Sequence, residues 1–169
     1  MRHVTPALLA AAWLAGCAVA PQASTPAGGP DNRAALAGVR DMKMAFDFTD
    51  GNPKVLLAKL NTVDVTRKQL IDDGVTPHIV LSFRGDASYY TQSDADKVKP
   101  EDREDARKVT AKIKELRTAT GVESLEQCNL PLAQRKLKAN EVIPEVKVVG
   151  NGWISLVAYQ QRGYAYISP

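Results

Sequence analysis

The sequence predicts an α/β domain in which a parallel or mostly parallel sheet lies between layers of helices. Strand-like runs alternate with helix-like segments along residues 43–167, the pattern of such folds. One run, residues 78–83 (HIVLSF), is almost entirely apolar, as expected of a strand covered on both faces. The length of 169 residues, with 44% hydrophobic and 24% charged residues, suits one globular domain with one core.

Turn and cap signals divide the first half of the domain into two strands and two helices. Pro53 follows the turn signal DGN and is placed to open a helix. Apolar residues then recur near helical spacing until Gly74, which ends that helix. The second helix begins with acidic residues, which suit its dipole, and ends at Gly121. The elements expected here are strands at residues 43–49 and 78–83 and helices at residues 53–73 and 100–120.

The second half is expected to contain three strands and two shorter helices. A strand leads into Cys128, and Pro131 then lies in the first turn of a short helix. The turn GNG at residues 150–152 separates the next strand from an amphipathic helix, and a final strand begins at Gly163. The elements expected here are strands at residues 122–127, 146–149 and 163–167 and helices at residues 130–138 and 153–161.

The amino terminus has the features of a bacterial lipoprotein leader. Arg2 precedes a short alanine-rich apolar stretch, whereas a bilayer span needs about 20 apolar residues. Residues 14–17 (LAGC) resemble the lipobox, in which the cysteine is acylated and becomes the new amino terminus. We therefore expect a signal peptide at residues 1–16, a lipidated Cys17 with a flexible tether at residues 17–38, and the α/β domain at residues 39–169.

This address predicts a protein that is anchored by lipid at the periplasmic face of the cell envelope. No aspartate next to Cys17 signals retention in the inner membrane, so the outer membrane is the expected location. The alternatives are a chance cysteine in an ordinary leader and a first transmembrane helix. A net charge of +3, with basic residues interleaved with acids, argues against a nucleic-acid partner. No motif indicates a cofactor.

Cys128 is the candidate catalytic residue. It lies where a strand ends and a helix begins, near backbone N–H groups and a positive dipole end that stabilise a thiolate. Ligand sites in open parallel sheets lie beyond the carboxyl ends of the strands. With Cys17 lipidated, Cys128 has no disulfide partner in its own chain. The supporting residues expected at the same edge are Asp50, Gly51, Arg84, Gly85, Asn129 and Asn151.

Three interpretations of Cys128 remain open at this point. Its thiolate accepts sulfane sulfur, or it packs as a small hydrophobic side chain in a non-catalytic envelope binding or assembly module, or it is a redox sensor that forms mixed disulfides. A metal site is not expected, because His78 is the only histidine after the leader. The turn at residues 150–152 lacks the G-x-G-x-x-G pattern of a dinucleotide site.

The carboxyl-terminal third of the chain resembles the DsrE/DsrF-like family. That family typically ends in a strand, a turn of small residues, an amphipathic helix with a glutamine, and a Gly-Tyr-Ala strand. It also tends to carry a cysteine at a strand end shortly upstream, which Cys128 matches. The resemblance covers about residue 42 to the carboxyl terminus. The matching segments are residues 142–152 (VIPEVKVVGNG), 154–156 (ISL), 159–160 (YQ), 163–165 (GYA), 126–129 (EQCN) and 46–51 (FDFTDG).

The resemblance implies a three-layer sandwich with a central, mostly parallel sheet of about five strands, of DsrE-like, flavodoxin-like topology. It also implies assembly into a homo-oligomer. Characterised family members relay sulfur as a cysteine persulfide, which would make Cys128 the acceptor and a thiol- or persulfide-bearing protein its partner. The activity implied is that of a sulfur carrier or sulfurtransferase without a bound cofactor. Thiolation of tRNA, another role in the family, does not fit the periplasm.

Overall fold

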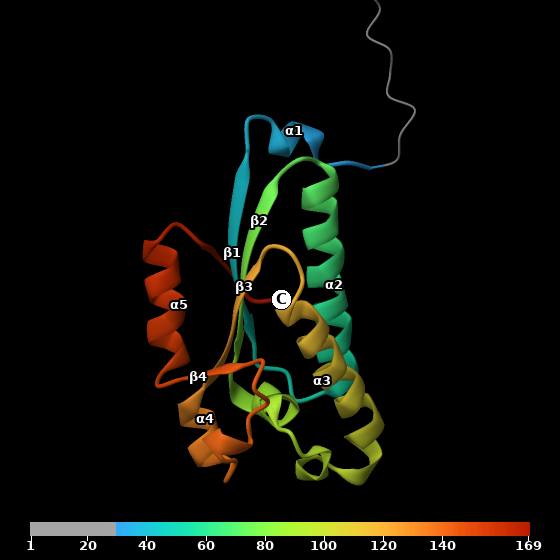
Figure 1. The fold of residues 1–169 in the computed structure, drawn as a ribbon, viewed down its shortest axis with the longest axis vertical. Coiled ribbons are helices and arrows are strands. Elements are labelled where there is room, and N and C mark those ends of the chain that lie inside the picture. Colours follow the sequence, from blue (N-terminus) through green and yellow to red (C-terminus); the bar gives the residue numbers. More distant parts are fainter. Residues whose placement is uncertain (1–29) are drawn as a thin grey trace, which may run out of the picture. The chain divides into compact units, whose positions relative to one another are not determined.

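The structure, a computed structural model, describes residues 30–169 and contains a five-stranded sheet in which all neighbouring strands are parallel (Figure 1). The strands are β1 (Asp41–Phe48), β2 (Thr76–Phe83), β3 (Val122–Cys128), β4 (Lys147–Val149) and β5 (Ala165–Ile167). Their order in the sheet is β4-β3-β2-β1-β5. The first four strands therefore lie side by side in chain order, and the fifth returns to the free edge of β1.

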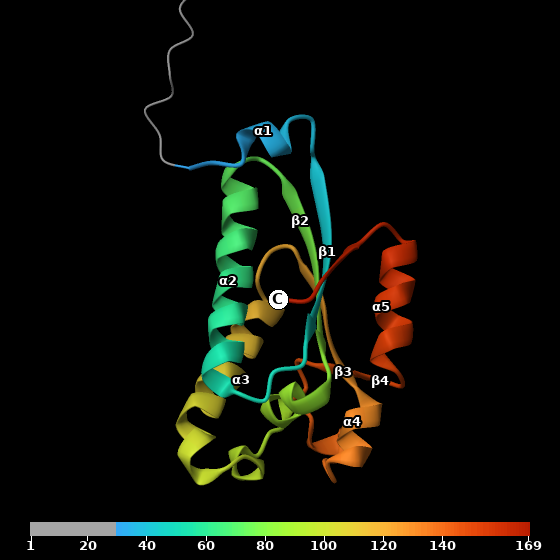
Figure 2. The same ribbon diagram turned by 180° about the vertical axis from the view of Figure 1, so that it is seen from behind.

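Helices cover both faces of this sheet. The α-helices are α1 (Arg33–Leu36), α2 (Pro53–Asp72), α3 (Arg103–Arg117), α4 (Asn129–Gln134) and α5 (Gly152–Gln161), and the 3-10 helices are η1 (Gly85–Thr91), η2 (Ala95–Lys97), η3 (Pro100–Asp102) and η4 (Ala139–Glu141). α2 and α3 pack together on one face (Figures 1 and 2). α5 lies on the other face, where it contacts β1, β2 and β3.

The main core lies between the sheet and the pair α2 and α3. Strand side chains alternate between faces, and those that point to this side are large and apolar. Phe48 stacks between Phe46 and Phe83, with ring centroids 6.2 and 5.7 Å away. Asn52 caps α2 by accepting the N–H of Lys54 at 2.9 Å. This face therefore provides most of the buried apolar surface of the domain.

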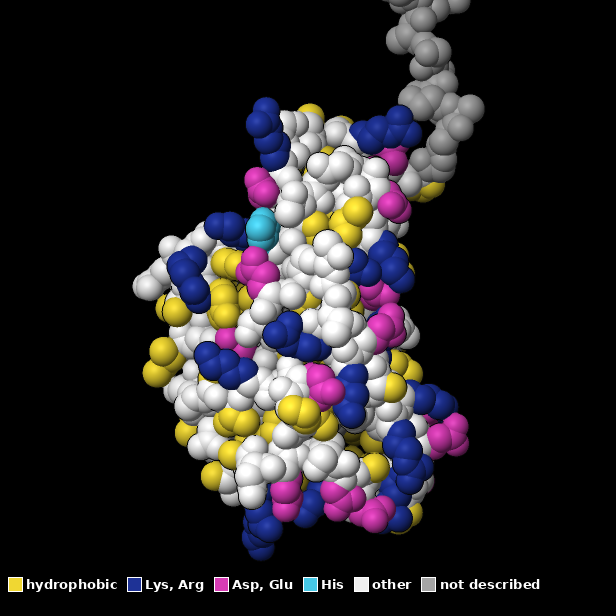
Figure 3. All heavy atoms as spheres, in the orientation of Figure 1, with side chains coloured by type: hydrophobic (Ala, Val, Ile, Leu, Met, Phe, Trp, Pro, Cys, Tyr) yellow, Lys and Arg dark blue, Asp and Glu magenta, His cyan; other side chains and the backbone are white. Residues whose placement is uncertain are grey.

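The α5 face has a much smaller apolar contact. Ala45 of β1, Val80 of β2 and Leu156 of α5 form its buried cluster. The rest of α5 is unusually apolar toward solvent, with Trp153 65% and Ile154 69% exposed. Figure 3 shows hydrophobic side chains gathered on the side of the molecule where α5 lies.

The predicted fold class, a three-layer α/β sandwich with a parallel five-stranded sheet, is confirmed. The strand order differs from the expected flavodoxin-like topology, in which the order is 2-1-3-4-5. The difference arises from the last crossover. α5 carries the chain over the opposite face of the sheet from β4 at one edge to β5 at the other, and so β5 pairs with β1.

The predicted strands and longer helices are present with boundaries shifted by a few residues, except in three places. α4 ends at Gln134, earlier than residue 138, because the chain turns at Lys136, whose φ is +57°. The 3-10 helix η1 follows β2 where only a loop is predicted. α1 lies inside the predicted tether at residues 17–38, and its Leu36 packs against the main core.

Within residues 30–169, no helix is long and apolar enough to cross a bilayer. The predicted signal peptide and Cys17 lie outside the described residues.

Candidate functional site

Cys128 is the last residue of β3 and is paired with Val149 at the end of β4. The turn after β4 therefore begins beside the thiol and brings the start of α5 over it. The N–H of Gly152, the first residue of α5, donates to Cys128 Sγ at 3.1 Å. Only 3% of Cys128 is exposed. The thiol is thus at the carboxyl edge of the sheet but covered by neighbouring groups.

Gly152 is the residue that allows this close approach. A Cβ atom at Gly152 would lie 3.0 Å from Cys128 Cβ and 2.7 Å from Arg84 Cδ. Any other residue would push one of these side chains away. Glycine at the start of α5 therefore lets the helix N–H, the thiol and the Arg84 side chain meet.

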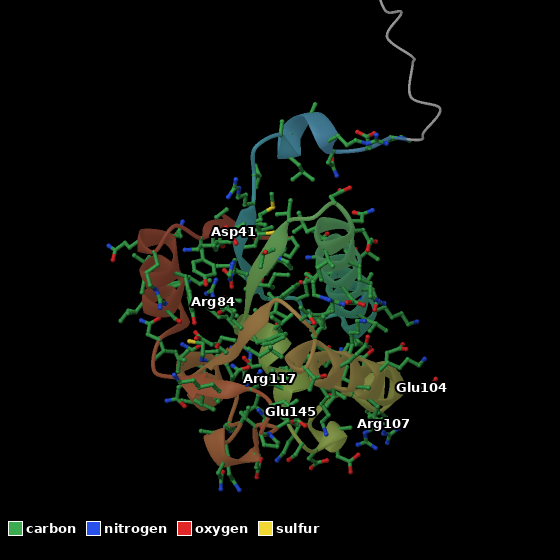
Figure 4. The ribbon with its side chains drawn as sticks, turned by 45° about the horizontal axis from the view of Figure 1, so that its top comes forward. Asp41, Arg84, Glu104, Arg107, Arg117 and Glu145 are labelled. Atoms are coloured by element: carbon green, nitrogen blue, oxygen red, sulfur yellow. The ribbon has the colours of Figure 1, made fainter. Side chains whose placement is uncertain are left out.

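Arg84 follows β2 and lies between the sheet and α5 (Figure 4). Its Nε donates to Asp47 Oδ1 at 2.8 Å, and its Nη2 donates to Asp47 Oδ2. Hydrogen bonding to Asp47 raises the pKa of Arg84, against the opposing effect of burial. The guanidinium also lies 5.4 Å from the ring centre of Trp153. These contacts hold the guanidinium, as an ion pair with Asp47, in the neighbourhood of Cys128.

This arrangement suits negative charge on sulfur. A backbone N–H at a helix start and a guanidinium are both groups that stabilise a thiolate or a persulfide anion. The role of Arg84 as a supporting residue was expected from its place at a strand end, and its contact with Gly152 brings it to Cys128. The reactivity of the thiol stays a prediction.

A buried amide network holds the backbone at Cys128. Gln127 Nε2 donates to the Cys128 carbonyl at 2.8 Å and to Ser88 Oγ at 2.8 Å. Thr91 Oγ1 donates to Gln127 Oε1 at 2.8 Å. η1 is therefore tied to the end of β3 through one fully buried side chain. The sequence offered a signal for this role only in that Gln127 is a polar residue next to Cys128 in a strand.

Sequence reasoning also missed a row of buried polar side chains under α5. Asp47 of β1 is in register with Ser82 of β2, and Ser82 is in register with Glu126 of β3. Their exposed fractions are 3%, 1% and 4%. Residues in register point to the same face, about 4.8 Å apart between neighbouring strands. We call these three side chains, Asp47–Ser82–Glu126, the polar row. Ser82 is two residues before Arg84, and Glu126 is two residues before Cys128.

The other predicted site residues are not all at the thiol. Asn151 caps α5 by accepting the Trp153 N–H at 3.0 Å, so it shapes the turn beside Cys128. Asn129 is exposed at the start of α4. Asp50 pairs with Lys59 of α2 at 2.8 Å. Its contacts therefore do not run to Cys128.

Gly51 and Gly85 lie in the segments that follow β1 and β2 at the same edge of the sheet. The carbonyl of Gly51 accepts a hydrogen bond from Tyr90, and burial raises the pKa of Tyr90 to about 12. Gly85 has a φ of +54°, a conformation that favours glycine. Gly51 also lines a cavity of about 350 Å³ that does not include Cys128. The remaining residues that line this cavity are Asp86, Tyr89, Tyr90, Lys97, Val98, Lys99 and Asp102.

Among residues 30–169, no three His, Cys, Asp or Glu side chains are grouped so that they could hold a metal ion. The candidate site is therefore described by its thiol, its N–H donor and its arginine.

These features define a parallel α/β sandwich with a cysteine at a strand end beneath a helix start. The DsrE/DsrF-like family matches residues 28–169, and the chain belongs to that family.

Two further proteins are similar to this chain. An uncharacterized protein from Aquifex aeolicus (strain VF5) is 24% identical over 126 residues, which cover 75% of this chain and 55% of the relative. The match therefore spans only about half the length of that relative. The solved structure of a protein of unknown function, MTH1491 from Methanobacterium thermoautotrophicum, has 21% identity and a TM-score of 0.48. It covers 77% of this chain and 99% of its own.

Proposed function

We propose that the protein carries sulfane sulfur as a persulfide on Cys128, taking it from a persulfide or polysulfide donor and passing it to a thiol of a partner protein. The observation that supports this function best is the contact of Cys128 Sγ with the Gly152 N–H at 3.1 Å, next to Arg84. Membership of the DsrE/DsrF-like family supports the same function, because sulfur relay is a role of that family.

The proposed transfer is an exchange between sulfur atoms without net oxidation. The Cys128 thiolate attacks the outer sulfur of the donor and forms a new S–S bond. The S–S bond of the donor breaks, and its electron pair leaves with the donor thiolate. An acceptor thiolate later attacks the outer sulfur of the Cys128 persulfide, and the Cys128 thiolate is released. At each stage the charged sulfur is close to a hydrogen-bond donor and a cation.

Intact-mass measurement tests this function directly. The full chain with Cys17→Ala, in which Cys128 is the only cysteine, is incubated with polysulfide and weighed. We expect a mass gain of one sulfur atom that is lost when a small thiol is added as acceptor. The matched control also carries Cys128→Ser and should gain nothing. An unchanged mass for the first protein, or an equal gain in both, would contradict the proposal.

The low exposure of Cys128 favours a second candidate, a non-catalytic envelope binding or assembly module in which the cysteine only packs. At 3% exposure, the side chain resembles the buried cysteines that act as small hydrophobic residues. This function predicts that Cys128 reacts with iodoacetamide only after unfolding and that Cys128→Ala keeps the native function. The sulfur-carrier function predicts rapid alkylation of the native protein, so the ratio of native to denatured alkylation rates separates the two.

The envelope location is part of the same proposal. We propose that Cys17 is acylated and anchors the domain at the periplasmic face of the outer membrane. Several acyl chains on one residue anchor stably, whereas one chain binds only marginally. Cys17→Ala should move the protein from the membrane fraction to the soluble fraction. Continued association with membranes would contradict the anchor.

We further propose that the chain forms a homo-oligomer through the solvent-facing side of α5. Trp153, Ile154 and Val157 are 65%, 69% and 51% exposed on one short helix, and clustered exposed apolar groups mark interfaces. The partner proposed is a second copy of the chain. Sedimentation should show an oligomer for the wild type and a monomer for Ile154→Lys. A monomeric wild type at high concentration would contradict this interface.

A further inference from the structure

The two carboxyl groups of the polar row are held in different ways. Asp47 is paired with Arg84 and accepts the Tyr166 hydroxyl at 2.8 Å. Glu126 has no cationic partner among residues 30–169, although buried carboxylates usually have one. Within this part of the chain its oxygens accept hydrogen bonds only from hydroxyl groups, those of Ser124 at 3.1 Å, Tyr159 at 2.8 Å, and Ser155. Glu126 is thus a buried acid whose hydrogen-bond partners in the described part of the chain are neutral hydroxyl groups.

Ser82 provides an independent observation at the same place. It is 1% exposed, and its Oγ has no hydrogen-bond partner in the described part of the chain. By register, this hydroxyl lies between Asp47 and Glu126. A buried hydroxyl without a partner costs about 1–3 kcal/mol. The row therefore contains a buried hydroxyl that has no partner in the described part of the chain and that stands in register between the two acids.

Glu126 is close to the thiol along both β3 and α5. Cys128 is two positions after Glu126 on β3, so both side chains lie on the α5 face, with Cα atoms about 6.6 Å apart. Both contact α5 within its first turn, because Gly152 donates to the sulfur and Ser155 donates to Glu126. Ser155 is three residues after Gly152 and therefore lies beside it on the helix surface. The first turn of α5 therefore contacts the acid through the Ser155 hydroxyl and the thiol through the Gly152 N–H.

We propose that Glu126 is the proton acceptor for the Cys128 thiol and that Ser155 connects the two. This inference rests on the proposed sulfur-carrier function and says which group at the same site accepts the proton of the Cys128 thiol. The Cys128 S–H proton passes to the Glu126 carboxylate as the sulfur attacks the donor. Glu126 then returns the proton to the departing donor thiolate. Protons and electrons balance, and no further reactant is needed.

The titratable and charged groups around this proton path come from several elements. They are Asp47 of β1, Arg84 after β2, Lys147 of β4 in register with Glu126, Tyr159 of α5, and Tyr166 of β5, with Arg162 stacked on the Tyr159 ring at 4.2 Å. Hydrogen bonding to Asp47 raises the pKa of Tyr166, and burial followed by the contact with Glu126 raises the pKa of Tyr159. These phenols therefore keep their protons near neutral pH and go on donating hydrogen bonds to Asp47 and Glu126.

The test compares Glu126→Gln with the parent chain, each carrying Cys17→Ala. The glutamine keeps the size and an oxygen acceptor but cannot take a proton. Two rates are measured from acid to alkaline pH: sulfur gain from polysulfide, and alkylation by iodoacetamide, an uncharged reagent. We expect both rates to fall about 10²-fold at neutral pH in Glu126→Gln. The deficit should shrink as pH rises, because hydroxide then removes the thiol proton.

Tyr159→Phe is the matched control, since it removes one hydroxyl from the same carboxylate and leaves the acid in place. It should change the rates far less, and equally at every pH. If the parent chain gains sulfur and Glu126→Gln gains it at the same rate throughout, the proton role is overturned and the carrier function stands. If the parent chain gains no sulfur but its alkylation still depends on Glu126, the carrier function is overturned and the proton role stands.

Circular dichroism shows whether Glu126→Gln folds. If it does not fold, Ser155→Ala replaces it, because this change removes the α5 hydroxyl that donates to the acid and would connect it to the thiol. The expected result is slower alkylation at neutral pH, with the deficit again closing toward alkaline pH. A parent rate in folded Ser155→Ala at every pH would then overturn the proposal.

Discussion

Between the sheet and helices α2 and α3, three stacked phenylalanine rings form part of a large continuous apolar core, whereas the buried apolar cluster described under α5 consists of Ala45, Val80 and Leu156. The remaining space under α5 is occupied by the polar row and by Cys128. Burial of apolar surface provides most of the stability of a domain. The face under α2 and α3 therefore provides most of the stability of the fold. The face under α5 contains buried polar groups and a thiol, which a fold does not need for its stability.

The acids on the two faces show the same contrast. Asp64 of α2 accepts from Arg67 at 2.8 Å, Lys68 at 2.8 Å and Lys112 of α3 at 3.0 Å, so three cations neutralise one carboxylate. Among the described residues, Glu126 has hydroxyl partners only. The cations on Asp64 join α2 to α3 by charge, whereas Glu126 is held without a charged partner among the described residues. The difference separates a structural acid from a candidate for chemistry.

The largest expected effect comes from emptying the main core. Phe48→Ala removes a fully buried ring that stacks on two others and should lower the free energy of unfolding by about 3–5 kcal/mol. Leu156→Ala, on the α5 face, should cost about 2 kcal/mol, because its cluster is small and close to solvent. Urea unfolding measures both. Equal losses would remove the contrast between the faces.

Asp64→Asn should have the next largest effect and lower the free energy of unfolding by about 2–3 kcal/mol at neutral pH. Burial would raise the pKa of Asp64, but hydrogen bonds from Lys68, Arg67 and Lys112 outweigh it and hold the pKa well below 3.8. The stabilisation is thus complete above the ordinary aspartate pKa and is lost as pH falls through the lowered one. Urea unfolding, measured from pH 7 into the acid range, should show that the difference in the free energy of unfolding between Asp64→Asn and the wild type becomes smaller as the pH falls.

The control for Asp64 is Asp50→Asn, which removes a carboxylate paired with a single lysine near the surface. Such pairs are worth about 0–1 kcal/mol. A loss at Asp50 as large as that at Asp64 would mean that the three-cation cluster has no special role.

A smaller effect is expected at the helix start over the thiol. Gly152→Ala places a methyl group 2.7 Å from Arg84 Cδ and should cost about 1–3 kcal/mol through overpacking. It should also change the alkylation rate of Cys128, because Arg84 must move. Gly150→Ala is the matched control, since nothing lies within 4 Å of its added Cβ. Identical behaviour of the two variants would show that Gly152 is not a point of close approach.

The fold was largely predictable because its signals are local. Gly74 and Gly121 have φ of +76° and +85°, and both were expected as helix ends. The early end of α4 could not be predicted, since Lys136 carries no sequence signal for its positive φ. The place of β5 beside β1 depends on which face α5 crosses, which is a property of the packed sheet rather than of any segment.

The candidate site was predictable in part for the same reason. Cys128 and Arg84 follow strands, and parallel strands bring their carboxyl ends together. The polar row was missed because it exists only through register. A signal was available, since Asp47 stands between two phenylalanines and Ser82 between a leucine and a phenylalanine, an alternation that marks a polar face. Only the pairing of strands shows that these residues are neighbours of Glu126.

The smallest effect is expected at His78, at the opposite end of the strands from Cys128. Its Nδ1 lies 2.6 Å from Glu123 and its Nε2 3.4 Å from Asp41, and the hydrogen bond with Glu123 leads the contacts that raise its pKa. A raised pKa stabilises the fold below pH 6.5 and the contribution is lost as pH rises through the folded value. His78→Gln should therefore cost about 0.5–1 kcal/mol in mildly acid solution and less at alkaline pH. Thermal unfolding at the two pH values measures this difference. A cost that grows with pH would contradict the ion-pair role and would show that His78 contributes to the fold mainly as a neutral side chain.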